Sequence, residues 1–516
     1  MENNQPWKRN LLGFVKHMVS QVEESSPGAT WVKDRMSHCI THNFYGSDID
    51  KWNGELAEEE YVFEGSRLLY DMPTGQCEEF LHFLAYHFPH EAHFGAHYGR
   101  YLYNNAPHEE EEEEKIFQKA RDELDRVLQI DDRDATIIHM RGMCPRRFVK
   151  RLLDRYGIRQ DAASYPKILK LVDEARSFFE KARMLNPADE HSYASEIELL
   201  RDLVNYGTRR VNDKVRLLAE RDDLRDWLYN AFRLLRQAEE RLLIRGSQYF
   251  RKIRGDLERL QGNYERAISA YQEAVRQLRG GAGTLDLKYQ IASLRYNHVI
   301  KSLMTDGQKL KIEDLQQARK ELEFVLQERN DERSLELWFK VYTLLPDYSP
   351  ETAESFLLRL YQITNGGLEA AFGLMCIWFI RAAQGNILAY RRLIEYRARS
   401  AEMAQRLPSL SYVKYWLGSN WRLIPDRLVQ RLESDKDERD LSGLMRLSGY
   451  VCEYRRPTIG KLRIGEGEVE VIFQPGRRPS GQLPFTQNDA ENRTKVSCVI
   501  SFTYDHPRAY DTMRDI

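Results

Sequence analysis

A recurring helical pattern that fills the chain from about residue 115 to 435 is the strongest constraint on its fold. Its clearest stretch has small residues and tyrosines at fixed intervals, at Gly255, Gly262, Tyr264, Ala267, Tyr271 and Ala274. Gly255 lets the first helix approach its partner closely, because it has no Cβ. The alanines keep the second helix thin on its packing face, and Tyr271 fills the space between the two. The pattern predicts a helix pair whose remaining apolar face must be covered by neighbouring pairs.

These intervals match the 34-residue tetratricopeptide repeat, whose unit is two helices joined by a turn. The second-helix part of the frame recurs three times, at Ala175, Phe179, Ala182 and Pro187, at Ala120, Leu124 and Val127, and at Ala318, Leu322 and Val325. The four occurrences lie at unequal intervals. We therefore expect an irregular array, with insertions or degenerate repeats between the good ones.

The periodicity falls from 3.6 to 2 near residue 436, which indicates strands. Alternating runs lie at 447–454, 461–464, 468–473 and 495–504, with glycines and prolines between them. Short strands in so small a region favour a closed barrel, because closure removes exposed edges. The sequence predicts a mostly α chain in three parts: an N-terminal helical region (1–105), a tetratricopeptide-like helical solenoid (115–435) and a small β-barrel (441–516).

Charge and cysteine usage limit the classes of partner. The 516 residues include 77 Lys and Arg against 79 Asp and Glu, so no global field directs the chain to nucleic acid or membrane. The six cysteines lie far apart without a C-x-x-C pair, which is typical of a reduced cytoplasmic protein. No apolar run approaches the roughly 20 residues of a membrane span, and no secretory signal is apparent. We expect a cytoplasmic protein without a membrane partner.

The sequence has no catalytic or cofactor motif. Nothing matches G-x-x-x-x-G-K-[ST], a G-x-G-x-x-G after a strand, G-x-S-x-G or H-E-x-x-H. The histidines His82, His87, His90, His93 and His97 are crowded by aromatic residues rather than by further ligands, so packing histidines are favoured over a metal site. The sequence predicts a non-enzymatic chain with no cofactor, metal or catalytic residue.

Basic and aromatic residues interleave in the predicted barrel. A barrel that offers rings for base stacking and cations for phosphates grips single strands without reading their sequence. The predicted nucleic-acid-binding residues are Tyr450, Tyr454, Arg455, Arg456, Lys461, Arg463, Phe473, Arg477 and Arg478. Against this hypothesis, about half of the aromatic residues must point into the barrel, and acids nearly balance bases after residue 441. A second basic cluster, from Arg141 to Arg159, is better explained as a solvated helix face.

Several short segments carry a family resemblance. They are Phe88 to Phe94 with Arg100 to Tyr103, Asn186-Pro187 through Tyr193 to Ile197, Gly449 to Val451, Glu470 to Phe473, and Val499 to Phe502 with Pro507 to Ala509. In sequence and order they resemble the C-terminal half of the antiviral STAND ATPases typified by sterile-alpha-motif domain-containing protein 9. The resemblance implies tetratricopeptide-like repeats followed by an OB-fold-like barrel.

The ATPase core of that family is missing from this chain. The resemblance therefore implies either a C-terminal fragment or one subunit of a split system, whose partner ATPase or effector is on a separate chain. Two functions remain open. In the first, the chain is a sensing or regulatory arm in antiviral or antiphage defence, which binds a protein or nucleic-acid trigger through the repeats and single-stranded nucleic acid or RNA through the barrel. In the second, it is a protein–protein scaffold or adaptor that binds no nucleic acid.

Overall fold

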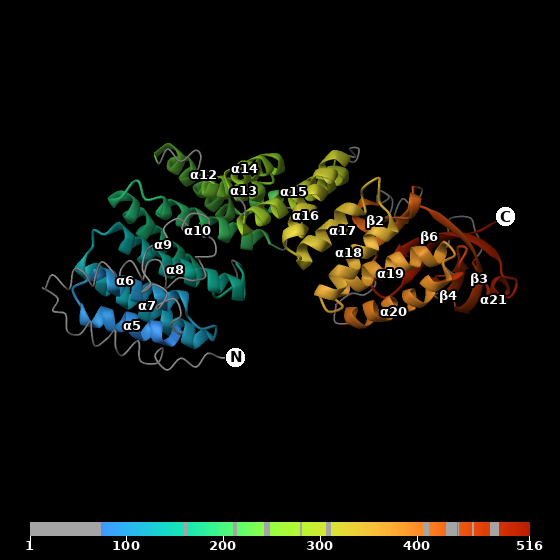
Figure 1. Cartoon of the computed structure of the whole chain (residues 1–516), viewed down its shortest axis with the longest axis horizontal. Helices are drawn as coiled ribbons and strands as arrows, with labels where there is room; N and C mark the ends of the chain where they lie inside the picture. The colour runs from blue at the N-terminus through green and yellow to red at the C-terminus, as the bar shows by residue number, and fades with distance from the viewer. Residues whose placement is uncertain are drawn as a thin grey trace. The chain divides into compact units, whose positions relative to one another are not determined.

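The computed structural model describes residues 74–158, 162–209, 214–241, 248–278, 281–305, 311–405, 412–429, 441, 443–456, 459–474 and 484–515. The chain divides into two compact units, Met1–Thr284 and Leu285–Ile516. Figure 1 shows helices along most of the chain and strands at its C-terminal end. Within the described residues, no helix is both long enough and apolar enough to cross a bilayer.

The described part of the first unit is entirely helical. Its elements are α5 (Thr74–His87), α6 (Ala92–Asn104), α7 (Glu110–Ile130), α8 (Ala135–Tyr156), α9 (Tyr165–Leu185), α10 (Glu190–Thr208), α11 (Lys214–Glu220), α12 (Asp222–Arg241), α13 (Gln248–Gln261) and α14 (Tyr264–Gln277). Consecutive helices pack as pairs, among them α6 on α7, α8 on α9 and α13 on α14. Most of the predicted N-terminal helical region, residues 1–73, lies outside the described residues.

A glycine facing a large side chain sets the closeness of three of these pairs. A Cβ on Gly255 of α13 would lie 2.4 Å from Cε1 of Tyr271 in α14. A Cβ on Gly142 of α8 would lie 2.8 Å from Cε1 of Phe179 in α9, and one on Gly99 would lie 2.7 Å from Cγ of Leu124. Phe179, Tyr271 and Leu124 are the large residues of three of the four predicted second-helix frames. This confirms the packing logic read from the sequence.

The second unit begins with further helix pairs. They are α15 (Ala282–Thr305), which starts at the unit boundary, α16 (Ile312–Glu328), α17 (Glu332–Tyr342), α18 (Pro350–Ile363), α19 (Leu368–Ala383) and α20 (Ile387–Ala404). Local signals explain several of the starts. The Ser349 side chain accepts a hydrogen bond from the Thr352 amide and Pro350 opens α18, while Asn386 caps α20 in the same way.

Seven strands follow the helices. They are β1 (Tyr415–Gly418), β2 (Arg422–Pro425), β3 (Arg446–Arg456), β4 (Ile459–Ile464), β5 (Val469–Phe473), β6 (Lys495–Phe502) and β7 (Pro507–Arg514), with α21 (Gln487–Glu491) between β5 and β6. Five of them close a barrel in the ring order β3-β4-β5-β7-β6, and β6 returns to β3. All pairs in the ring are antiparallel except β5–β7, which is parallel.

This ring is a five-stranded Greek-key barrel of the OB type. The predicted fold class, tetratricopeptide-like helices followed by a small OB-like barrel, is confirmed. Two strand assignments differ from the sequence reading. The β1–β2 hairpin, which joins β6 at Tyr415 opposite Phe502, lies in the stretch predicted to be helical. The closing strand β7 was not predicted as a strand of its own, because Arg508, Tyr510 and Asp511 blur its apolar alternation.

Candidate nucleic-acid interface on the barrel

The predicted basic residues of β4 lie on the outside of the barrel. Lys461 and Arg463 alternate with the buried Gly460, Leu462 and Ile464, so their side chains point outward. On β3, Tyr450 lies opposite Arg463 and Glu453 lies opposite Lys461, while Glu470 of β5 lies opposite Arg463. We call this surface the outer β4 face, defined by Tyr450, Glu453, Arg455, Lys461, Arg463 and Glu470. In an OB fold the second and third strands, here β4 and β5, form the usual ligand-binding face.

Carboxylates neutralise part of the outer β4 face. Lys461 Nζ lies 3.0 Å from a carboxylate oxygen of Glu453 and 3.0 Å from one of Glu470. Arg455 also pairs with Glu453, and Arg463 lies 3.4 Å from Glu468 in the β4–β5 turn. The sequence showed that acids nearly balance bases in this region, but it did not show which carboxylate pairs with which cation. The face therefore presents a mosaic of both signs.

The ion pairs hold these groups in their charged states. Hydrogen bonds to Glu470 and Glu453 raise the pKa of the Lys461 ammonium group. A hydrogen bond from Arg455, followed by one from Lys461, lowers the pKa of the Glu453 carboxyl group. Both shifts favour the ionised form. The charge pattern of the face therefore does not change near neutral pH.

The three predicted stacking rings have different positions. Tyr450 is half-buried on the outer face, where its hydroxyl donates to Glu468 and the Arg493 guanidinium lies 5.4 Å from its ring centroid. Tyr454 lies opposite Gly460, which is itself opposite the buried Phe473, so Tyr454 has the inward parity and is only partly exposed. Phe473 is 2% exposed. Its predicted stacking role is wrong, because the alternation along β5 turns its ring into the barrel core.

Two of the remaining predicted cations lie outside the described residues, namely Arg477 and Arg478. Arg455 and Arg456 are exposed at the end of β3. Arg456 forms no ion pair within the part of the chain that the structure describes. The structure thus brings Tyr450, Arg455, Lys461 and Arg463 together on one face, with Arg456 at its border.

Helices occupy another surface that OB folds use for ligands, the loop between the last two strands. Here that loop is Thr503 to His506. The Tyr504 ring lies 4.8 Å from the Phe372 ring of α19, its hydroxyl bonds to Glu369, and Ser400 of α20 donates to its carbonyl at 2.5 Å. These contacts cover the loop around Tyr504, whereas the outer β4 face carries exposed side chains.

The second basic cluster, predicted as a solvated helix face, forms ion pairs between helices instead. Arg141 of α8, whose side chain is 5% exposed, lies 2.6 Å from Asp125 of α7 and 2.7 Å from Glu174 of α9. Arg155 lies 2.7 Å from the fully buried Glu113. These arginines are committed to joining neighbouring helices and offer little free charge to a ligand. The last member of the cluster, Arg159, lies outside the described residues.

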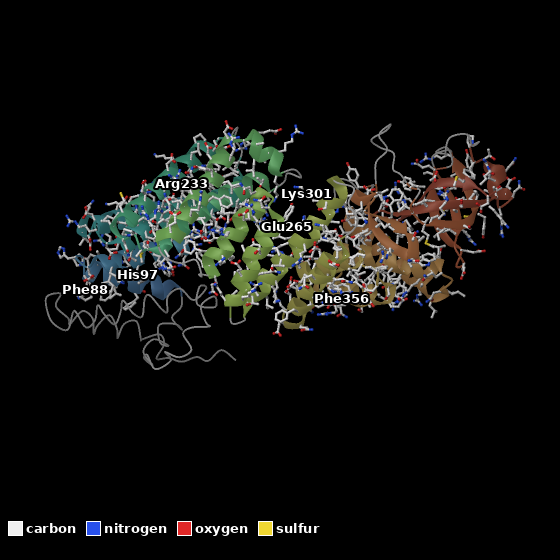
Figure 2. All side chains as sticks on the ribbon, turned by 90° about the horizontal axis from the view of Figure 1, so that it is seen from above. Phe88, His97, Arg233, Glu265, Lys301 and Phe356 are labelled. Carbon is white, nitrogen blue, oxygen red and sulfur yellow. The ribbon has the colours of Figure 1, made fainter. Side chains whose placement is uncertain are left out.

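The histidine group contains one close pair. The Nε2 atoms of His93 and His97 are 3.0 Å apart, and His97, labelled in Figure 2, is almost fully buried in α6. Burial lowers the pKa of both imidazoles. The described residues contain no group of three or more His, Cys, Asp or Glu side chains arranged to hold a metal ion.

Fold and site together define a helical-repeat protein that ends in an OB-like barrel. No family model matches the sequence, and no curated protein matches it. Among solved structures, the chain is similar to Pseudomonas aeruginosa PilF, with 16% identity and a TM-score of 0.30 over 54% of this chain and 96% of that one. It is also similar to human IFIT1, solved as a dimer with m7Gppp-AAAA, with 10% identity and a TM-score of 0.35 over 78% and 82% of the two chains. Likenesses this distant assign no function.

Proposed function

We propose that this chain is a non-enzymatic sensing arm of an antiviral or antiphage defence system, and that its barrel binds single-stranded nucleic acid on the outer β4 face. The observation that carries the binding proposal is the position of Lys461 and Arg463. They project from the strand that OB folds use for oligonucleotides, beside a tyrosine ring and two exposed arginines. The resemblance to antiviral STAND ATPases supports the defence setting, with the ATPase or effector on a partner chain.

The carboxylates on this face do not prevent phosphate binding. A surface ion pair contributes only about 0–1 kcal/mol, so a phosphate can replace Glu453 or Glu468 as the partner of a cation at little cost. The same carboxylates repel a polyanion, which favours weak binding with a strong dependence on salt. Each phosphate contact on a single strand contributes a slope of about −0.7 to log K against log salt.

The test is fluorescence anisotropy with labelled single-stranded RNA and DNA at two salt concentrations. The test variant is Arg455→Gln, Arg456→Gln and Arg463→Gln, which leaves the bridge from Lys461 to Glu453 and Glu470 in place. The matched control removes the same charge from exposed helix residues, by Arg233→Gln, Arg236→Gln and Arg266→Gln; Arg233 is labelled in Figure 2.

The proposal predicts that the barrel variant loses affinity at least tenfold and that its salt slope falls by about 2, three contacts at about 0.7 each. The helix control should bind like the unmodified chain. Equal loss in both variants would show that the interaction follows overall charge and not this face.

A protein–protein scaffold is the second candidate. The interleaved Glu453, Glu468 and Glu470 favour it, because these three carboxylates offset three of the four positive charges of Arg455, Arg456, Lys461 and Arg463. Absence of binding to either nucleic acid at the lower salt concentration would overturn the nucleic-acid proposal and favour this alternative.

A further inference from the structure

The last helix of the array, α20, carries an apolar stripe that is fully or partly exposed along its length. The α20 stripe consists of Ile387, Tyr390, Ile394, Ala398 and Ala401. Ile387 is 86% exposed, Ile394 46% and Tyr390 39%. A group of exposed apolar residues on one surface indicates an interaction site, whereas single exposed apolar residues are common on any protein.

A second face of α20, centred about 120° around the helix from the stripe, is firmly held. Ala389, Leu393, Tyr396, Ser400 and Ala404 are buried and lie at helical spacing, and α20 packs closely on α19. The helix therefore cannot turn to hide the stripe without giving up that contact. The exposure is a fixed property of the folded unit.

The spacing of the stripe fits another helix. Ile387, Ile394 and Ala401 follow one another at seven-residue intervals, with Tyr390 three residues after the first, as in the seam of two packed helices. Side-chain size falls along the stripe, from Ile387 and Tyr390 through Ile394 to Ala398 and Ala401. A partner helix must therefore offer small residues at one end and large residues at the other.

A second copy of the same helix, running antiparallel, meets this requirement. We propose that two copies of this chain pair through their α20 stripes across a two-fold axis that passes near Ile394. Tyr390 of each copy then packs against Ala398 of the other, and Ile387 packs against Ala401. A two-fold interface needs one surface that is complementary to itself, and the decrease in side-chain size along the stripe provides it.

Charge at the border of the stripe favours the same arrangement. Arg391 and Glu395 are exposed beside it. Antiparallel pairing near Ile394 brings Arg391 of one copy close to Glu395 of the other, whereas parallel pairing would oppose Arg391 to Arg391 and Tyr390 to Tyr390.

The stripe is shorter than a standard interface, which has roughly 20–30 residues on each side. We therefore expect a reversible dimer that dissociates on dilution. Sedimentation velocity of the full chain over a concentration series measures this directly. The unmodified chain should shift from monomer to dimer, and Ile387→Glu with Ile394→Glu should weaken the dimer at least tenfold.

The matched control is Leu388→Glu. Leu388 is 83% exposed but lies about 100° around the helix from Ile387, away from the stripe. This variant should dimerise like the unmodified chain. All three sites, Ile387, Leu388 and Ile394, are exposed, and a far-ultraviolet circular dichroism spectrum checks that each variant is folded. A chain that stays monomeric at every concentration, or a stripe variant that dimerises normally, would overturn the proposal.

Disulfide trapping tests the antiparallel register. Cysteine at 394 should cross-link to its own counterpart under mild oxidation, and cysteines at 390 and 398 together should also cross-link. Tyr390→Cys alone should not, because its two copies would lie about 12 Å apart along the helix axis, too far for a disulfide. The unmodified chain, with its own cysteines, gives the background. Efficient linking by Tyr390→Cys alone would overturn the antiparallel arrangement.

Discussion

The contact between Gly255 and Tyr271 gives the sharpest test of the helix-pair packing. Gly255→Ala adds one methyl group where the ring carbons Cε1 and Cδ1 of Tyr271 lie 2.4 and 2.5 Å from the new Cβ. Tyr271 is fully buried, and its hydroxyl donates to Asp256 at 2.5 Å. The ring must shift by about 1 Å to restore ordinary carbon–carbon contact, and the shift strains that hydrogen bond.

Two opposing terms set the magnitude. Replacing glycine by alanine inside a helix stabilises it by about 1 kcal/mol. Overpacking a filled core costs typically 1–3 kcal/mol, and the upper end applies here because the obstructing atoms belong to a rigid, hydrogen-bonded ring. We expect a net loss of about 2 kcal/mol in the free energy that holds α13 and α14 closed.

Hydrogen exchange measured by mass spectrometry is the suitable assay, because a chain with two units does not unfold in one step. Amides of α13 and α14 should exchange faster in Gly255→Ala. The control is Gly283→Ala in the first turn of α15, where the nearest atom to the added Cβ is Leu278 Cδ1 at 3.9 Å. Its exchange should stay the same or slow.

Variants at Tyr271 separate the clash from other effects. Tyr271→Phe in the Gly255→Ala background removes the hydroxyl but keeps both obstructing carbons, so it should not restore stability. Tyr271→Leu replaces the flat ring with a smaller branched side chain that can move, and it should restore part of the stability lost in Gly255→Ala. Slower exchange in Gly255→Ala than in the unmodified chain would refute the reasoning.

Two further predictions follow from burial and close approach. Burial lowers the pKa of His139 to about 4, below its unfolded value of about 6.5. The unfolded chain therefore binds more protons as the pH falls, and the first unit should lose about 2 kcal/mol of stability between pH 7 and pH 5. Thermal unfolding at the two pH values measures this loss, and the variant His139→Gln should show a smaller dependence on pH. In Gly467→Ala a new Cβ would lie 1.9 Å from the carbonyl oxygen of Ala382, so the β4–β5 turn should separate from α19. The Glu466 amide, which donates to the Ala383 carbonyl at 2.9 Å, should then exchange its hydrogen faster, while the amides of the barrel strands stay protected.

The sequence predicted the second helices of the repeats better than the first. The pattern of small and large residues in a second helix spans only a few positions, so insertions elsewhere in the chain do not disturb it. The glycine of the first helix is a more distant signal. It lies 16 residues before its partner in the pair of Gly255 and Tyr271, but 37 residues before it in the pair of Gly142 and Phe179. A fixed-period search cannot find glycines at such variable distances.

The barrel shows a different limit. Lys461 and Arg463 lie on the outside of β4, and the strict period of two along a strand is enough to explain that position. The same period of two places the Phe473 ring inside the barrel. Phe473 was nevertheless predicted as a binding residue, because it lies near basic residues in the sequence. The covering of the loop around Tyr504 by α19 and α20 could not be predicted, because the contact joins Glu369 to Tyr504 across 135 positions of the chain.

The two basic clusters look alike in sequence, and their surroundings separate them. Arg141 is buried between two carboxylates on neighbouring helices. A phosphate that displaced one of these carboxylates from Arg141 would leave the carboxylate without a partner in the helix interface, at a cost of several kcal/mol. Arg463 pairs with Glu468 at the surface, where exchange of one anion for another costs about 1 kcal/mol or less. A polyanion can therefore compete for the barrel cations but not for those between the helices. Of the two clusters, we expect only the one on the barrel to contact nucleic acid.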